Sequence, residues 1–244
     1  MQPAITEVPT LYEDVLTVWV APASPYSLAG ANGPFGFDID LATEVARRLA
    51  LEARIVPAHG DPFAALEDRL TDVVVAGAPI SVELETRVNL SQPYVRVLQA
   101  LVVNGEARPD IRGLDDLAEG DQVAVAEDTT GQAWAVATLE PHALGLQPYD
   151  DVEAAAVALA AGRVDGLLVD EADAIAAARA RPSLLIVETV PTGAGLGIAV
   201  DPRNGTLLDA VNEALLAMAA DGTYDRIYDR YEAALPPGGR ITAG

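Results

Sequence analysis

Acidic side chains are the residues of this chain whose type and spacing could do chemistry. Asp170 and Glu171 end the apolar run that starts at Gly166, and Asp128 follows a second apolar run that ends at Ala126. Open α/β sheets bind ligands at the carboxyl ends of their strands, and a carboxylate at that edge favours a cation beside it. The sequence therefore offers a site for a positively charged group. The alternative is that these acids are solvated surface residues.

Most other site chemistries lack the residues that they need. The chain has no cysteine, which excludes disulfides, thiolate metal sites and cysteine nucleophiles. The two histidines, His59 and His142, each neighbour Gly or Pro, so we expect both on loops. They leave little for zinc binding or a serine–histidine relay. We therefore predict no metal site, no cofactor and no catalytic residue.

Composition indicates a globular protein with an acidic surface. Of 244 residues, 50% are hydrophobic and 21% are charged, and the formal net charge is -22. This charge argues against nucleic acid or an anionic membrane as the partner. It chiefly supports solubility, with attraction for cationic solutes as a second interpretation. No apolar run approaches the ~20 residues of a transmembrane helix, and the first residues lack the basic start and apolar core of a secretory signal.

The first half of the chain alternates apolar strands with helical segments. We expect strands at residues 15–21, 54–56 and 73–76, and helices that begin at the caps Asp38 and Asp61. Strands and helices in this alternation predict a parallel sheet with covering helices.

The second half repeats this organisation. A strand at residues 121–126 leads into a helix near residues 132–139, and the strand after Asp165 parallels the strand after Asp72. Two similar α/β lobes are therefore expected, joined by apolar crossovers. We predict lobe 1 at residues 1–98 and 191–244, lobe 2 at residues 104–186, and hinge crossovers at residues 96–103 and 184–190.

Several segments resemble one protein family. Residues 71–94, TDVVVAGAPISVELETRVNLSQPY, are similar to the signature of the family 3 extracellular solute-binding proteins, the amino-acid receptors of ABC importers. The family usually has an Asp-led strand, then Ile-Thr-x-x-Arg, then Phe-Ser-x-Pro-Tyr. Four further segments match in order: GFDIDLA at 36–42, IRGLDDLAEGDQVAVAEDTTG at 111–131, GRVDGLLVD at 162–170 and AVNEALLAMAADGTYDRIYDRY at 210–231.

This resemblance implies an architecture and a setting. The fold would be the α/β, two-lobe type II periplasmic-binding fold, in which each lobe is a mostly parallel sheet with flanking helices. A ligand would lie in the cleft between the lobes, and hinge closure would be the working motion. The partners would be a small-molecule solute and the membrane permease of an ABC importer. We expect a monomer in the periplasm or outside the cell, with the export signal outside this chain. A lipid anchor is an alternative means of holding it at the membrane.

The resemblance also assigns the binding residues. Asp170 matches the lobe-two Asp that takes a ligand's ammonium group, and Thr130 matches a hydroxyl and backbone contact. Asp128 stands where the family has a glycine. In lobe one, Leu84 occupies the position of the Arg that grips the ligand's carboxylate, so that grip is lost. The predicted ligand-binding residues are Tyr26, Gly77, Ala78, Leu84, Arg87, Asp128, Thr130 and Asp170.

Lobe one departs from the family at further positions. Pro79 lacks an N–H donor, and Ala23 stands where many members have an aromatic residue. Arg87, one helical turn after Leu84, could replace the missing clamp or be a surface charge, and Arg96 is a second replacement. Without a clamp, the cleft would be apolar on one side and acidic on the other, which favours a cation or amine over a simple amino acid.

Three functions fit these residues. The prediction is a non-enzymatic solute receptor for an amino-acid-like or amine-like ligand. The first alternative is an accessory or sensor module with a degenerate cleft that binds another protein. The second is a cyclohexadienyl-dehydratase-like enzyme with Glu171 or Asp170 as proton donor. The missing clamp Arg argues against that enzyme, because its substrate is anionic.

Overall fold

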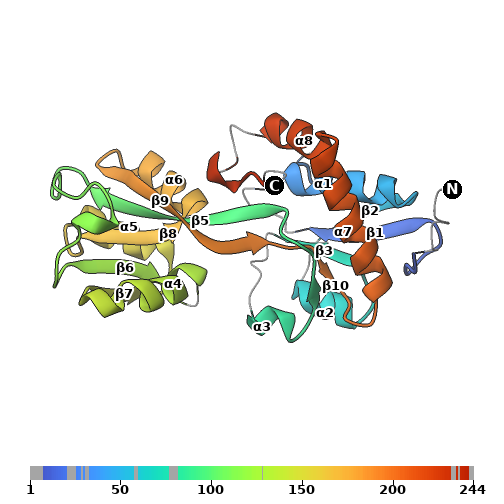
Figure 1. Ribbon diagram of the computed structural model, residues 1–244, viewed down its shortest axis with the longest axis horizontal. Helices are drawn as coiled ribbons and strands as arrows, with labels where there is room; N and C mark the ends of the chain where they lie inside the picture. Colours follow the sequence, from blue (N-terminus) through green and yellow to red (C-terminus); the bar gives the residue numbers. More distant parts are fainter. Residues whose placement is uncertain are drawn as a thin grey trace. The chain divides into compact units, whose positions relative to one another are not determined.

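The structure, a computed structural model, describes residues 8–20, 26–28, 30, 33–57, 60–76, 82–127, 129–231, 235 and 237–241 (Figure 1). The chain divides into two compact units. Lobe one comprises residues 1–96 and 195–244, and lobe two comprises residues 97–194. The chain passes from one lobe to the other within strands β5 (Val95–Asn104) and β9 (Leu184–Leu196).

Lobe one is built on a mixed sheet. In spatial order its described strands are β2 (Glu52–Pro57), β1 (Val15–Val20), β3 (Val73–Val75), β10 (Ala199–Val200) and β4 (Asn89–Leu90). β1 pairs in parallel with β2 and β3, and β10 runs antiparallel between β3 and β4. The central strands are buried on both faces, which explains their continuous apolar sequences.

The helices of lobe one begin at recognisable caps. They are α1 (Phe37–Arg48), α2 (Pro62–Glu67), α3 (Val82–Glu85), α7 (Gly205–Ala220) and α8 (Thr223–Tyr231), followed by a short 3₁₀ turn, η3 (Pro237–Gly239). Asp61 caps α2 as predicted, because its Oδ1 accepts a hydrogen bond from Phe63 N at 2.9 Å. The prediction that Asp38 caps α1 is wrong. Gly36 is the cap, with φ 139°, and Asp38 lies in the first turn with its side chain buried.

An aromatic cluster joins α1 and α8 in the core of lobe one. The ring of Phe37 lies 5.4 Å from Tyr228 and 5.9 Å from Tyr224, edge to face in both pairs, and 6.2 Å from Tyr94. Such pairs add about 0.5–1.5 kcal/mol beyond the burial of their apolar area. The cluster explains why α1 and α8 pack against each other, as Figure 1 shows.

Lobe two is built on a second mixed sheet. Its described strands, in spatial order, are β7 (Gly145–Tyr149), β6 (Gln122–Ala126), β8 (Gly166–Asp170), β5 and β9. β6 is parallel to β7 and β8, whereas β5 is antiparallel to β8. The helical segments are η1 (Leu114–Asp116), α4 (Thr130–Thr138), η2 (Glu140–His142), α5 (Val152–Ala160) and α6 (Glu171–Ala180).

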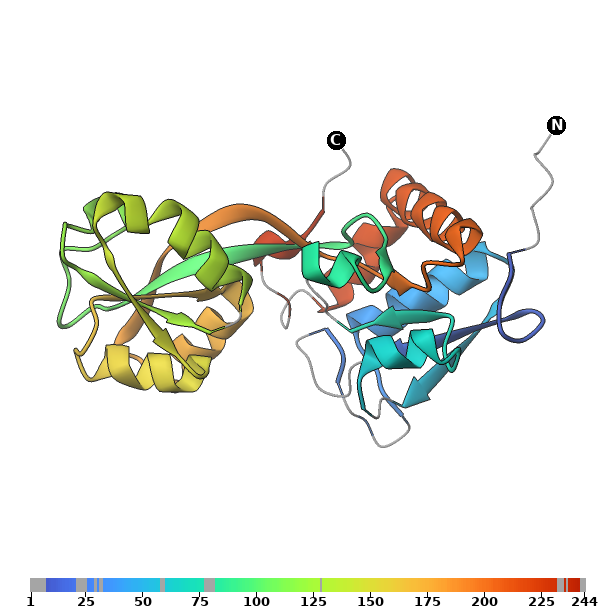
Figure 2. The ribbon, with the colours of Figure 1, turned by 90° about the horizontal axis from the view of Figure 1, so that it is seen from below.

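Alternate residues of β6 and β8 face different helices. Val123, Val125 and Leu168 pack with Ala135 of α4 and with Leu139, the residue that follows it, so one face of the sheet is covered by that helix. Residues 124, 167 and 169 pack instead with α5. This is the two-residue period of a strand with both faces buried, and Figure 2 shows α4 and α5 on opposite sides of the sheet.

Each lobe contains the same kind of hydrogen bond from a strand to an Asp, as the sequence pattern predicts. Asp72, just before β3, accepts a hydrogen bond from Thr17 N of β1 at 2.8 Å. Asp165, just before β8, accepts one from Gln122 N of β6 at 2.9 Å. In each lobe an Asp therefore ties the start of one parallel strand to its neighbour, which confirms the parallel drawn between the two sequence segments.

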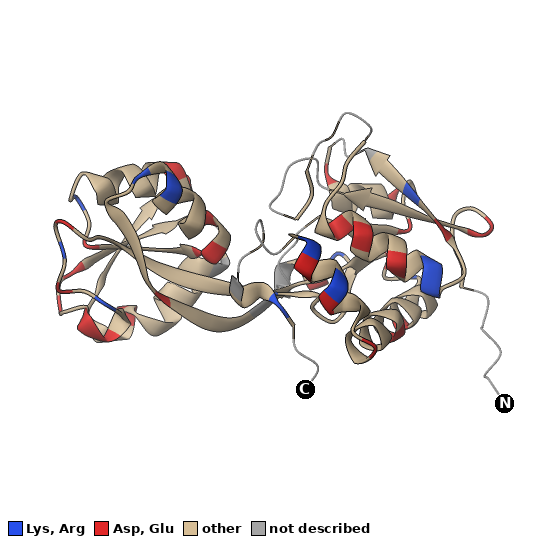
Figure 3. Ribbon diagram, turned by 90° about the horizontal axis from the view of Figure 1, so that it is seen from above, with Lys and Arg blue, Asp and Glu red and all other residues tan. Residues whose placement is uncertain are grey.

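Charged residues are spread over both lobes (Figure 3). All 15 basic residues are arginines, against 37 acidic residues, so arginine is the permanently charged side chain that can pair with a carboxylate here. Within the described residues, no helix is long and apolar enough to cross a membrane. The same residues contain no group of three or more acidic or histidine side chains that could hold a metal ion.

Candidate functional site

Asp170 lies where β8 ends and α6 begins. It occupies the N-cap position of α6, but its side chain makes no capping hydrogen bond to that helix. Instead, Asp170 Oδ1 accepts a hydrogen bond from Nε2 of Gln99, which stands directly opposite on β5. Opposed residues of an antiparallel pair point to the same face of the sheet. The carboxylate is therefore held by a neighbouring strand and not by its own helix.

The surroundings of Asp170 make it costly to keep its negative charge. Burial raises its pKa, and the hydrogen bond from Gln99 lowers it in part. Asp173, in the first turn of α6, has an exposed side chain, but partial desolvation and the charge of Asp170 still raise its pKa. Within the part of the chain that the structure describes, no arginine forms an ion pair with either carboxylate. This edge of the sheet therefore carries two neighbouring carboxyls that no described arginine neutralises.

The first turn of α4 lies beside the side chain of Gln99, which holds Asp170. Thr129 caps this helix: its Oγ1 accepts from Gln132 N at 3.1 Å and donates to Ala126 O at 2.8 Å. A Cβ atom placed on Gly131 would lie 2.5 Å from Oε1 of Gln99, so the first turn of α4 packs closely on that amide. The carboxyl ends of the parallel strands β6 and β8 thus meet around Gln99, as expected for a ligand site in an open sheet.

The structure places the predicted lobe-two residues unevenly. Thr130 is the first residue of α4, next to the cap, which is Thr129. Asp128 lies outside the described residues. Asp170 is half-buried at the sheet edge. Glu171 is nearly buried, with 8% of its surface exposed.

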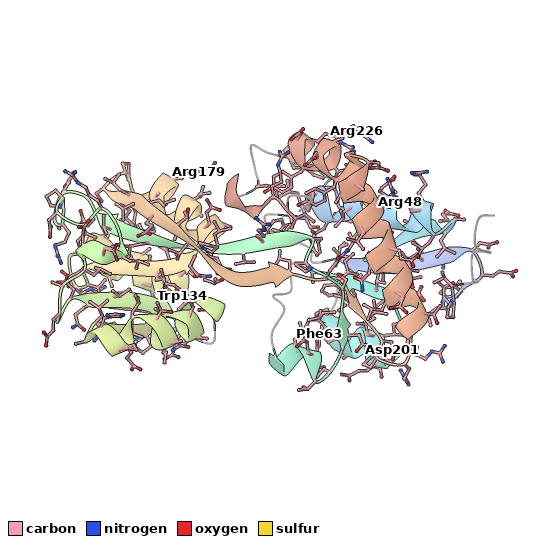
Figure 4. All side chains as sticks on the ribbon, viewed as in Figure 1. Arg48, Phe63, Trp134, Arg179, Asp201 and Arg226 are labelled. Atoms are coloured by element: carbon pink, nitrogen blue, oxygen red, sulfur yellow. The ribbon has the colours of Figure 1, made fainter. Side chains whose placement is uncertain are left out.

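Two lobe-one predictions lie around α2 and α3. Leu84, in α3, is partly buried against a cluster that includes Trp19 and Val74. Arg87 follows α3, is exposed, and pairs through Nη2 with Asp61 at 3.0 Å and Glu67 at 3.1 Å. Its guanidinium carbon lies 5.7 Å from the centroid of the Phe63 ring, a side chain labelled in Figure 4.

The other lobe-one predictions are less fully placed. Tyr26 is buried, and its carbonyl oxygen accepts a hydrogen bond from Asp38 N at 3.0 Å. Arg96 is exposed. Gly77 and Ala78 lie outside the described residues, as do Ala23 and Pro79.

A family model agrees with this architecture. The model of the bacterial extracellular solute-binding proteins, family 3, matches residues 16–234, which is most of the chain. This protein belongs to the family 3 solute-binding proteins. The resemblance drawn from the sequence motifs and the predicted α/β fold are thereby confirmed.

Relatives of this solute-binding protein are receptors for amino acids. It is 30% identical over 214 residues to the ABC transporter arginine-binding protein 1 of Escherichia coli (strain K12), covering 85% of this chain and 86% of the relative. Among solved structures it is similar to an ancestral arginine-binding protein bound to arginine, with a TM-score of 0.65, 33% identity and coverage of 89% and 98%. An ancestral amino-acid-binding protein, a precursor of cyclohexadienyl dehydratase, aligns with a TM-score of 0.64, 30% identity and coverage of 89% and 95%.

Gln99 is the residue of this site that sequence reasoning missed. It interrupts the apolar run of β5 and is fully buried. A buried amide in such a run is unusual, because an amide needs hydrogen-bond partners there. A polar residue in an apolar strand indicates a specific polar contact, but the sequence does not show which residue lies opposite Gln99 on the neighbouring strand.

Proposed function

We propose that this solute-binding protein captures a small cation, either a cationic amino acid or an amine, and delivers it to the permease of an ABC importer. The observation that carries the proposal is the pair of lobe-two carboxyls, Asp170 and Asp173, whose pKa values are raised and which no described arginine neutralises. In this proposal Asp170 receives the positive charge of the ligand.

A bound cation would remove an electrostatic cost that the free protein carries. A half-buried carboxylate beside a second carboxyl is disfavoured by desolvation and by repulsion. An ammonium or guanidinium group relieves both and adds charge-assisted hydrogen bonds, each worth about 1.5–3 kcal/mol. A neutral ligand supplies neither gain. The arginine-binding relatives support the same choice of charge.

The residues of lobe one favour a ligand whose binding does not require a protein group that binds its carboxylate. Leu84 packs on apolar side chains, and leucine has no donor for a carboxylate. Arg87 is engaged with Asp61 and Glu67 of the α2 region. We therefore propose that amines without a carboxylate bind nearly as well as the corresponding amino acids.

The remaining parts of the proposal follow from the family. We propose a receptor without catalytic activity that acts outside the cytoplasmic membrane, because the family consists of extracellular solute-binding proteins. The relation to a precursor of cyclohexadienyl dehydratase keeps an enzyme as the second candidate. A raised pKa at Asp170 would suit a proton donor in that enzyme.

A thermal-shift panel separates these functions. Arginine, lysine, agmatine, cadaverine, glutamine and prephenate would each be added to the purified protein. A ligand at 100-fold its Kd adds about 2.7 kcal/mol to the free energy of unfolding. The proposal predicts strong stabilisation by the four cationic compounds, weaker stabilisation by glutamine, whose one positive group is its α-ammonium, and none by prephenate. Stabilisation by prephenate together with its conversion to product would establish that the protein is an enzyme. No stabilisation by any compound of the panel would favour an accessory module.

A further inference from the structure

Gln99 occupies an unusual position for a polar side chain. It lies in the middle of β5 with none of its surface exposed. Its Nε2 donates to Asp170 Oδ1, while its Oε1 is buried and has no hydrogen-bond partner in the described part of the chain. Leaving a buried polar atom unpaired costs about 1–3 kcal/mol. The fold tolerates this cost to keep an amide next to Asp170.

Gly131 provides the space for this amide. A Cβ atom at position 131 would lie 2.5 Å from Oε1 and 3.2 Å from Cδ of Gln99, both shorter than a normal van der Waals contact. The backbone of Gly131 is helical, within α4, so conformational freedom is not the reason for a glycine there. The absence of a side chain is what lets the amide fit between α4 and β8.

The hydrogen bond determines which carboxylate oxygen remains available. Oδ1 of Asp170 is engaged by Gln99, and no hydrogen bond to Oδ2 is formed within the described residues. The bond also restrains rotation of the carboxylate, since Asp170 makes no capping bond to α6. Oδ2 is therefore the carboxylate oxygen with no hydrogen bond among the described residues, and we expect a ligand to bind there.

We propose that Gln99 is a positioning residue for ligand recognition: it fixes the orientation of Asp170 so that Oδ2 meets the ligand's cationic group, and Gly131 is required because it makes room for the Gln99 amide. This inference rests on the proposed role of Asp170 in binding a cation. It adds a residue from the strand that joins the two lobes to the recognition machinery.

The chemistry of the bond gives a readout that loss of packing alone would not produce. An amide N–H stabilises the carboxylate form of an acid, so losing it raises the pKa of the acid. For Asp170, burial already raises the pKa, and Gln99 opposes that effect. Among the described residues, Asp173 of α6 is the titratable group whose charge interacts with Asp170, whereas Gln99 of β5 and Gly131 of α4 do not titrate.

The test compares Gln99→Leu and Gly131→Ala with the wild-type protein and with Gln147→Leu. The control alters an exposed glutamine of the same lobe, which bonds to Gln122. NMR of the side-chain carboxyl carbons would follow the titration of Asp170 without ligand. Calorimetry would give the Kd of arginine at pH 7 and pH 5. Gly131→Ala introduces the residue with the highest helix propensity into α4, so it tests the proposal even where Gln99→Leu fails to fold.

We expect both variants to raise the pKa of Asp170 and to bind arginine about tenfold more weakly at pH 7, with a larger loss at pH 5. Gln147→Leu should match the wild type. An unchanged Asp170 titration in Gln99→Leu or Gly131→Ala would overturn the role of Gln99, whatever happens to affinity. Failure of the wild-type protein to bind any cationic compound would instead refute the proposed function.

Discussion

The hydroxyl of Tyr94 donates a hydrogen bond to Oδ1 of Asp38 at 3.2 Å in the core of lobe one. Asp38 is fully buried at the first turn of α1, and its Oδ2 has no partner within the described residues. Burial raises the pKa of Asp38 to about 7, and the hydrogen bond from Tyr94 lowers it in part. Lobe one thus contains a carboxyl that titrates near neutral pH.

Replacing Asp38 with Asn should change how stability depends on pH. Because the folded pKa of about 7 exceeds the ordinary value of 3.8, the native state binds more protons between these values. The wild-type protein therefore loses stability as pH rises through that window. Asp38→Asn removes this loss, so its free energy of unfolding relative to wild type should improve by about 3 kcal/mol between pH 5 and pH 8. Urea unfolding at both pH values measures it, and parallel pH profiles would contradict it.

Arg87→Ala should leave ligand binding unchanged. The guanidinium is exposed and already paired with Asp61 and Glu67, and such surface pairs contribute about 0–1 kcal/mol to folding. Calorimetry with arginine should give the wild-type Kd within about twofold, and urea unfolding a small loss of stability. A loss of affinity greater than about tenfold would instead identify Arg87 as the replacement clamp.

Leu84→Arg should restore recognition of a carboxylate. The sequence motif predicts that Leu84 occupies the position of the clamp Arg, and an Arg side chain can bind a carboxylate through two parallel hydrogen bonds. We expect the preference for arginine over agmatine to increase by about tenfold or more. The folded protein should lose stability, because Leu84 packs on the apolar cluster around Trp19. Leu84→Met is the control for packing, and an unchanged preference in Leu84→Arg would show that this position does not face the ligand.

The fold could be read from the sequence where local signals repeat. The Asp that precedes a strand in each half, Asp72 and Asp165, predicted two similar lobes, and both bind the neighbouring parallel strand. The cap at Asp61 was equally predictable, because proline follows it at the first helical position. At α1 the capping signal was misleading. Gly36, the residue before α1, has a positive φ, and its lack of a side chain allows its backbone to approach Tyr26 O. Gly36 therefore takes the cap position, and Asp38 lies in the core.

The candidate site could be read only in part. Asp170 follows an apolar strand, so its place at the sheet edge was predictable. The contact with Gln99 depends on the antiparallel register of β5 and β8, which joins residues far apart in the chain. Arg87 likewise follows α3, but its partners come from the α2 region. Pairings of this kind arise from tertiary packing and leave no local pattern.

Calorimetric titration of arginine and agmatine against the wild-type protein and Asp170→Asn would show whether Asp170 receives the ligand's positive charge and whether binding needs a carboxylate. The two compounds share a guanidinium and differ in the carboxylate. We expect Kd values within about tenfold of each other, and a loss of about 100-fold for both in Asp170→Asn. Agmatine binding more than about 100-fold weaker than arginine, or undiminished binding to Asp170→Asn, would contradict this expectation.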